Sequence, residues 1–301
     1  MTRKLKNSLL AALAIVGLGI VYYWVRRKRT VSFKDYTPSA EAEAQAAQLR
    51  SSLTMLSSSP VYLPALGFIE GSSTTARSSF PVVNVKAPIT LPRDEKQIRI
   101  NQAKALVQQY DTQVSTSARE TGVPRYLHYA IILHENPQGI ATLDEGNGTG
   151  LGAITLVTPT DSIRMAMKKG RLTAKQIAII QATASQSKNI LASSDLGAKL
   201  ITKSDLKKPD LNVLLIGIQL QNMFHQFGTD KLHQVLFAYN RGISAAKTFL
   251  STNKLTGADA STLIEKSKGL PYYATGSTYV LNQLGVNGIL DIIVNEVGIT
   301  D

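Results

Sequence analysis

The chain has 301 residues, of which 44% are hydrophobic and 18% charged, a composition that excludes a largely disordered protein. The net charge is +12, but residues 1–30 carry seven Lys and Arg and no acid. Residues 94–301 carry twenty-one Lys and Arg against seventeen acids, a net of +4. More than half of the excess positive charge therefore lies in residues 1–30, and the sequence does not predict a basic nucleic-acid-binding domain. The absence of cysteine excludes disulfides, cysteine-ligated metals and thiol catalysis.

Residues 8–25 are predicted to form a membrane anchor, because this run of eighteen residues contains no charge. As a helix it would extend ~27 Å, close to the ~30 Å hydrocarbon core of a bilayer. A cleaved signal peptide is the alternative. It is disfavoured because a tetrabasic cluster at 26–29, not a small-residue cleavage site, follows the run. The chain is expected to contact a lipid bilayer through 8–25, with its orientation open because both flanks are basic.

The rest of the chain divides into a spacer at 31–93 and a domain at 94–301. A short helix is expected between Pro38 and Ser57, followed by a Ser- and Pro-rich linker up to Arg93. The domain is predicted to be mainly α, since apolar residues recur at helical spacing in four stretches. These stretches are Lys96–Ala118, a helix starting at Pro124, one starting near Asp210, and Leu232–Tyr239 with Gly242 as its stop. The best strand signal is Ile154–Val157.

Glu135 ends one of these helices and is the first candidate for catalysis. It follows the apolar run 131–133, and Pro137 disfavours continuation of the helix beyond Asn136. A carboxyl beside an apolar face loses hydration, which raises its pKa toward the range that a general acid needs near neutral pH. The other interpretation is an ordinary solvent-exposed helix end.

Two later segments carry weaker signals. Glycines alternate with other residues in 146–152, which lets a backbone approach a ligand but also suits an ordinary loop. At 237–242 the chain reads Phe-Ala-Tyr-Asn-Arg-Gly, and helical spacing turns Tyr239 inward, where its hydroxyl needs a polar partner. Asn240 is placed either to bind a ligand amide or to cap the helix.

No metal site or cofactor is expected. His134 and Glu135 begin like a zinc-protease motif, but that motif needs a second His four residues after the first, and position 138 is Gln. The remaining histidines show no ligand spacing with His134.

Together, the order and spacing of these segments resemble the catalytic domain of soluble lytic transglycosylases, which is related to goose-type lysozyme, over roughly residues 122–284. Glu135 matches the catalytic Glu of the family, and Asn212 matches the Asn of its Asn-Ile helix. Three short motifs of the family complete the resemblance. Gly150, Leu151 and Ile154 match three positions of the family's Gly-Leu-Met-Gln-Ile. The Ala-Tyr-Asn-x-Gly motif is matched by Ala238, Tyr239, Asn240 and Gly242, and the Tyr-Val motif by Tyr279 and Val280. The main departure is Ala153 in place of the loop Gln, whose amide helps hold substrate in the family. Asn147 and Thr155 are the candidate substitutes.

The resemblance implies a mainly α (α+β lysozyme-like) domain that cleaves the β-1,4 bond between N-acetylmuramic acid and N-acetylglucosamine in peptidoglycan strands. Glu135 would first donate a proton to the glycosidic oxygen and then accept one from the muramic acid 6-hydroxyl, which closes a 1,6-anhydro ring. Tyr239 would orient Glu135. The resemblance assigns substrate binding to Gly150, Leu151, Ile154, Asn240 and Tyr279.

Three functions stay open. A membrane-anchored lytic transglycosylase is favoured, either in a bacterial inner membrane with its domain in the periplasm or in the internal membrane of a phage virion. A goose-type lysozyme-like hydrolase would need a second carboxyl to position a water, and Asp144 and Glu145 are the candidates. A non-catalytic wall-binding protein would keep the fold and be indifferent to replacement of Glu135.

Overall fold

The computed structural model describes residues 93–301 except 147, 194 and 286. The predicted anchor at 8–25, the short helix after Pro38 and the linker up to residue 92 lie outside the described residues. No helix among the described residues is long and apolar enough to cross a membrane.

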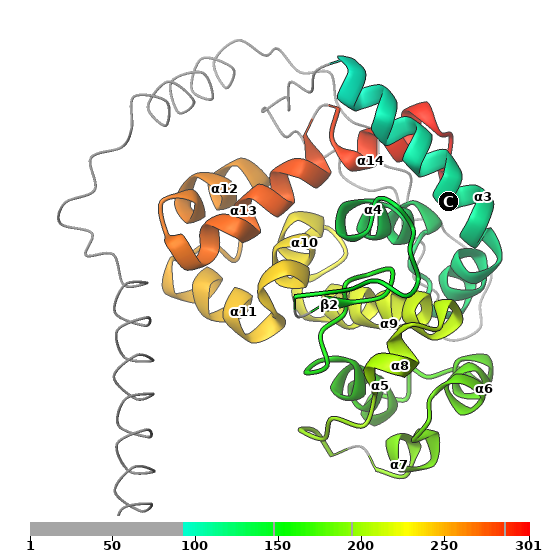
Figure 1. Cartoon of the computed structure of the whole chain (residues 1–301). Coiled ribbons are helices and arrows are strands. Elements are labelled where there is room, and N and C mark those ends of the chain that lie inside the picture. Colours follow the sequence, from blue (N-terminus) through cyan, green and yellow to red (C-terminus); the bar gives the residue numbers. More distant parts are fainter. Residues whose placement is uncertain (1–92, 147, 194, 286) are drawn as a thin grey trace, which may run out of the picture. The chain divides into compact units, whose positions relative to one another are not determined.

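The described residues are mainly helical (Figure 1). The helices are α3 (Arg93–Thr121), α4 (Arg125–Glu135), α5 (Pro159–Lys168), α6 (Ala174–Thr183), α7 (Ser187–Leu191), α8 (Lys203–Leu206), α9 (Pro209–Phe227), α10 (Leu232–Arg241), α11 (Ile243–Thr252), α12 (Ala260–Lys268), α13 (Pro271–Leu284), α14 (Ile289–Asp291) and the π-helical turn η2 (Ile292–Glu296). One short antiparallel hairpin joins β1 (Asp144–Glu145) to β2 (Gly148–Thr149), with Asp144 opposite Thr149 and Glu145 opposite Gly148.

The four helices expected from apolar spacing are present as α3, α4, α9 and α10. Gly242, with φ of +85°, follows α10 as expected for a helix stop. The predicted strand Ile154–Val157 is wrong. Ile154 makes only an isolated bridge with Thr149, and the loop then turns into α5. Three of the four residues are β-branched, but pairing with β2 stops at Ile154, and pairing rather than propensity makes a strand.

Helix α9 lies at the centre of the domain. It contacts α3, α4, α5, α6, α8 and α10, so it is buried on nearly every side. The apolar stripe expected at its start widens into a helix that is buried over most of its length, with a few polar residues among the apolar ones. Helices α3 and α4 lie on one side of it, and α10 connects it to α11, α12 and α13, drawn in yellow and orange in Figure 1.

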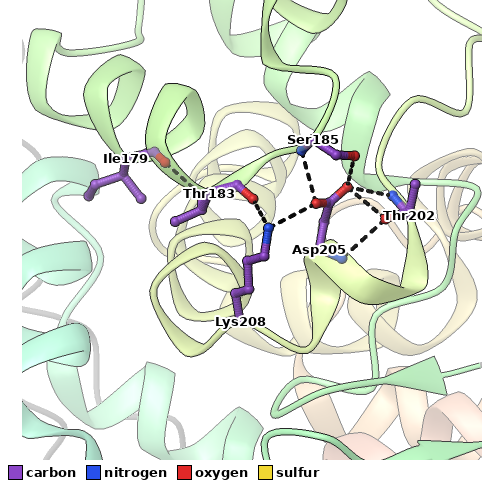
Figure 2. Close-up of polar contacts among 6 residues, drawn as sticks. All are labelled: Ile179, Thr183, Ser185, Thr202, Asp205 and Lys208. Carbon is purple, nitrogen blue, oxygen red and sulfur yellow. Dashed lines mark hydrogen bonds and ion pairs between the residues drawn. The ribbon is translucent and has the colours of Figure 1, made fainter.

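A buried carboxylate secures the chain just before α9 (Figure 2). Asp205, 1% exposed, accepts hydrogen bonds from the main-chain N–H and hydroxyl groups of both Ser185 and Thr202. Lys208 adds an ion pair at 3.3 Å. Burial by itself would raise the pKa of Asp205, but the hydrogen bonds from Thr202 and Ser185 outweigh it and lower the pKa to about 2. This network holds α8, whose last carbonyl supports the site described next.

Candidate active site

Glu135 is the last residue of α4 and carries a carboxyl with a raised pKa. The helix ends here because Pro137 disfavours αR geometry at Asn136, whose φ is −149°. The run 131–133 before Glu135 is in the core. Burial raises the pKa of Glu135 to about 7, and the nearby Tyr279 hydroxyl acts in the opposite direction. A large fraction of this carboxyl is therefore protonated at neutral pH.

Two tyrosines lie near this carboxyl, and one of them packs against the His134 ring. Tyr279, on α13 and 2% exposed, lies 4.1 Å from the His134 ring and 6.2 Å from the Tyr239 ring, centroid to centroid. Its hydroxyl lies beside Glu135 and has no hydrogen bond within normal distance and angle limits. Burial raises the pKa of both tyrosines well above 10, so both stay neutral wherever Glu135 titrates.

Tyr239 binds the glycine loop and lies near Glu135. It lies close enough to Glu135 for the charge of that residue to raise its pKa, after burial. Its hydroxyl, however, donates to the Gly152 carbonyl at 3.2 Å. The sequence expectation assigned Tyr239 to orient Glu135. In the structure Tyr239 supports the loop, and the hydroxyl beside the carboxyl belongs to Tyr279.

Asn212 on α9 shapes the glycine loop. Its Oδ1 accepts from the Gly152 N–H at 2.9 Å, and its Nδ2 donates to the carbonyls of Thr149 and Leu206 at 3.1 and 2.8 Å. The loop fits so tightly that a Cβ on Gly150 would lie 2.2 Å from the Asn212 Nδ2. A Cβ on Gly152 would lie 2.7 Å from Ile216. The glycines thus allow close packing against α9.

Asn136 secures the other end of the loop. Its amide nitrogen donates to the carbonyls of Ile140 at 2.8 Å and Gly150 at 3.3 Å, while its Oδ1 accepts from the Ile140 N–H. The residue after Glu135 therefore ties the end of α4 to the glycine loop, and it is 2% exposed.

A groove of about 750 Å³ runs along this loop. It is lined by the glycine loop from Gly152, the start of α5, one side of α9 and the α10–α11 junction. Of the expected substrate-binding residues, Ile154 and Asn240 line it, whereas Gly150, Leu151 and Tyr279 are buried outside its lining. Thr155 also lines the groove, and Asn147 lies outside the described residues. Glu135 is not in the lining of the groove, whereas Tyr239, which lies near enough to feel its charge, is.

Asp144, a candidate second carboxyl, is committed to two lysines. It pairs with Lys203 at 2.7 Å and Lys207 at 3.4 Å. The hydrogen bond from Lys203 is the main reason that its pKa lies below the ordinary value. Of Glu145, the other candidate, only the main chain is described. The Asp144 carboxylate is therefore ionised and paired with these two lysines.

Sequence reasoning missed Gln219, which lines the groove from α9. Gln219 is a polar residue inside an apolar run, and this could have drawn attention to it. Helical spacing alone, however, does not show which side of a buried helix meets a groove. No cluster of His, Asp and Glu within the described part of the chain could hold a metal ion.

The chain was compared with protein families, curated proteins and solved structures. No family model matches it, and neither does any curated protein or solved structure.

Proposed function

We propose that the chain is a peptidoglycan lytic transglycosylase in which Glu135 is the single acid and base. The observation that carries this proposal is the largely buried carboxyl of Glu135, with a pKa of about 7, at a helix end near two neutral tyrosines, of which Tyr239 lines the groove. The order of sequence motifs supports the same function, including the lysozyme-like fold that the resemblance implies.

The reaction needs one group that changes protonation state twice. Protonated Glu135 donates to the glycosidic oxygen as the C1–O bond breaks and the sugar becomes oxocarbenium-like. The resulting carboxylate takes the proton of the muramic acid 6-hydroxyl, whose oxygen bonds to C1. The proton balance closes, and Glu135 returns to its acid form without consuming water. A pKa near 7 suits both half-steps, since neither form is strongly disfavoured at neutral pH.

The hydrolase alternative needs a carboxylate that is free to position a water. Asp144 is a poor candidate because its oxygens are engaged by Lys203, Lys207 and the Thr149 hydroxyl. A non-catalytic protein would not need Glu135 in a site where burial disfavours its charged form. Anchoring through 8–25, in a bacterial inner membrane or a virion membrane, is part of the proposal.

The test is digestion of purified peptidoglycan by the whole chain in detergent, with the fragments identified by mass spectrometry. The wild type should release fragments with 1,6-anhydro ends, and Glu135→Gln should release none. Glu265→Gln, at an exposed position on α12, is the matched control and should retain activity. Fragments heavier by the mass of one water would establish the hydrolase instead. Binding without cleavage by the wild type would establish a wall-binding protein.

A further inference from the structure

A second cavity, of about 250 Å³, lies where α3, the end of α4, α13 and α14 meet. Its polar lining comes from Arg99 and Gln102 on α3, His134 on α4 and Asn282 on α13. It shares no lining residue with the groove. Because one water needs only ~10–15 Å³, this cavity has room for a ligand group.

The lining of this cavity carries one permanent positive charge. Arg99 supplies it, and no Asp or Glu is among the described residues that line the cavity. The guanidinium of Arg99 lies near the imidazole of His134, since its charge, after burial, lowers the pKa of His134 to about 4. The imidazole is therefore neutral at neutral pH, and Arg99 alone makes the lining positive. Such a lining favours an anion.

Arg99 keeps most of its donors for a ligand. Within the described part of the chain, its side chain donates only through Nη2, to Glu95 at 2.8 Å. Glu95 lies one turn earlier on the same helix and its side chain is 43% exposed, so this ion pair contributes little. A guanidinium has five N–H donors in a fork that matches the two oxygens of a carboxylate.

Two primary amides add further donors. No side-chain hydrogen bond ties Gln102 or Asn282 to another described residue, and both residues are partly exposed. Each amide nitrogen can donate two hydrogen bonds. A carboxylate is the group that matches this lining, because it is negatively charged and its two oxygens accept about four hydrogen bonds.

We propose that this cavity binds a carboxylate, which pairs with Arg99 and accepts hydrogen bonds from Gln102 and Asn282. The inference rests on the proposed function for the source of the anion, since peptidoglycan carries carboxylates on the peptides attached to its glycan strands. It deepens that function by adding a contact to the peptide. A free organic acid presents the same group, and the experiment separates the two sources.

The length of such a peptide is sufficient to bridge Glu135 and the cavity. His134 and Pro137, which line the cavity, are one and two residues from Glu135 in the chain. Consecutive Cα atoms lie ~3.8 Å apart, whereas an extended peptide of four residues spans at most ~14 Å.

The experiment measures binding to the whole chain in detergent by isothermal titration calorimetry at constant pH. The probe is a disaccharide-tetrapeptide in which N-acetylglucosamine precedes N-acetylmuramic acid, so the bond that the proposed reaction cleaves is absent. The partner probe is the same molecule with every carboxylate converted to a primary amide, which removes the charge and keeps the size. The wild type should bind the acid form about fivefold or more tightly, as expected for a charged pair at a partly exposed site.

Three variants test whether this preference depends on the cavity. Arg99→Gln should bring the two probes to within about twofold of each other. Gln102→Leu removes one donor without changing the charge and should weaken binding of the acid form about threefold. Arg119→Gln is the matched control, because it removes the same charge from the same helix at a side chain that is 67% exposed, and it should keep the preference. Loss of the preference in both arginine variants, or in neither, overturns the inference.

Acetate, titrated alone, distinguishes the two sources. If the wild type shows no preference between the probes but binds acetate, and Arg99→Gln does not bind it, the carboxylate site stays and its ligand is a free organic acid. If the wild type shows neither the preference nor acetate binding, the inference is refuted.

The outcome is separable from that of the proposed function. A chain that fails to cleave peptidoglycan but shows an Arg99-dependent preference refutes the proposed function and keeps this inference. A chain that releases anhydro fragments but binds both probes and acetate independently of Arg99 keeps the proposed function and refutes this inference.

Discussion

The hydroxyl of Tyr279 lies beside the carboxyl of Glu135, although the two residues come from α13 and α4. This neighbour partly offsets the effect of burial on the carboxyl, so the pKa of Glu135 reflects two opposing influences.

Cleavage should depend on pH through the protonation of Glu135. In the proposed reaction Glu135 starts protonated, and its pKa is about 7. We expect kcat/KM for peptidoglycan to fall about tenfold per pH unit well above pH 7, since each unit removes about nine-tenths of the acid form. Initial rates across the range from acid to alkaline pH check this. Activity that rises steadily far above pH 7 contradicts an acid role for Glu135.

Glu135→Gln should increase stability at alkaline pH. The folded pKa of about 7 exceeds the ordinary value of 4.5, so the folded state binds more protons between these values. The wild type should therefore lose about 2 kcal/mol of unfolding free energy between about pH 5 and about pH 8. Glu135→Gln should not show this loss. Urea unfolding followed by circular dichroism measures both, and parallel pH curves for the two proteins refute the prediction.

Tyr279→Phe should move the alkaline limb of the pH profile upward. Removing the hydroxyl leaves burial unopposed, so the pKa of Glu135 should rise further above 7. Tyr239→Phe is the matched control, because its hydroxyl donates to Gly152. We expect it to cost about 1 kcal/mol of stability instead, with a much smaller shift of the limb. A limb that moves to lower pH in Tyr279→Phe contradicts the assignment.

Asn212→Ala should loosen the glycine loop. The change leaves the Gly152 N–H and the carbonyls of Thr149 and Leu206 without their partner. We expect a loss of about 3 kcal/mol in unfolding free energy. Hydrogen exchange should show faster exchange of the Gly152 amide. Asn101→Ala, at an exposed position on α3, should change stability by less than about 0.5 kcal/mol. Equal effects of the two substitutions would falsify the role of Asn212.

Asp205→Asn should lower the free energy of unfolding at every pH except in strong acid. The folded pKa of about 2 lies below the ordinary 3.8, so the stabilisation is complete above the ordinary value and disappears as pH falls through 2. At neutral pH the variant should lose about 2 kcal/mol relative to wild type. The difference should shrink as pH falls from 3.8 to 2. Asp195→Asn, at an exposed position, is the control, and a pH-independent difference for Asp205→Asn contradicts this account.

Local patterns along the chain are enough to predict the mainly helical class and four helices of the domain. Apolar spacing over ten or so residues is such a pattern, and Pro137 and Gly242 mark helix ends by restricting or freeing the backbone of one residue. The same local reasoning singled out Glu135, because an apolar run before a helix end places a carboxyl against the core. Its raised pKa agrees with that reasoning.

Which groups meet one another depends instead on how the helices pack. Tyr279 reaches Glu135, and Tyr239 bonds to Gly152, only because α13 and α10 pack together beside the glycine loop. The strand expected at Ile154–Val157 did not form because a strand requires a partner, which local propensity does not supply. Gln219 could not be singled out on a helix that is buried on nearly every side. The face of this helix that meets the groove depends on the helices packed around it.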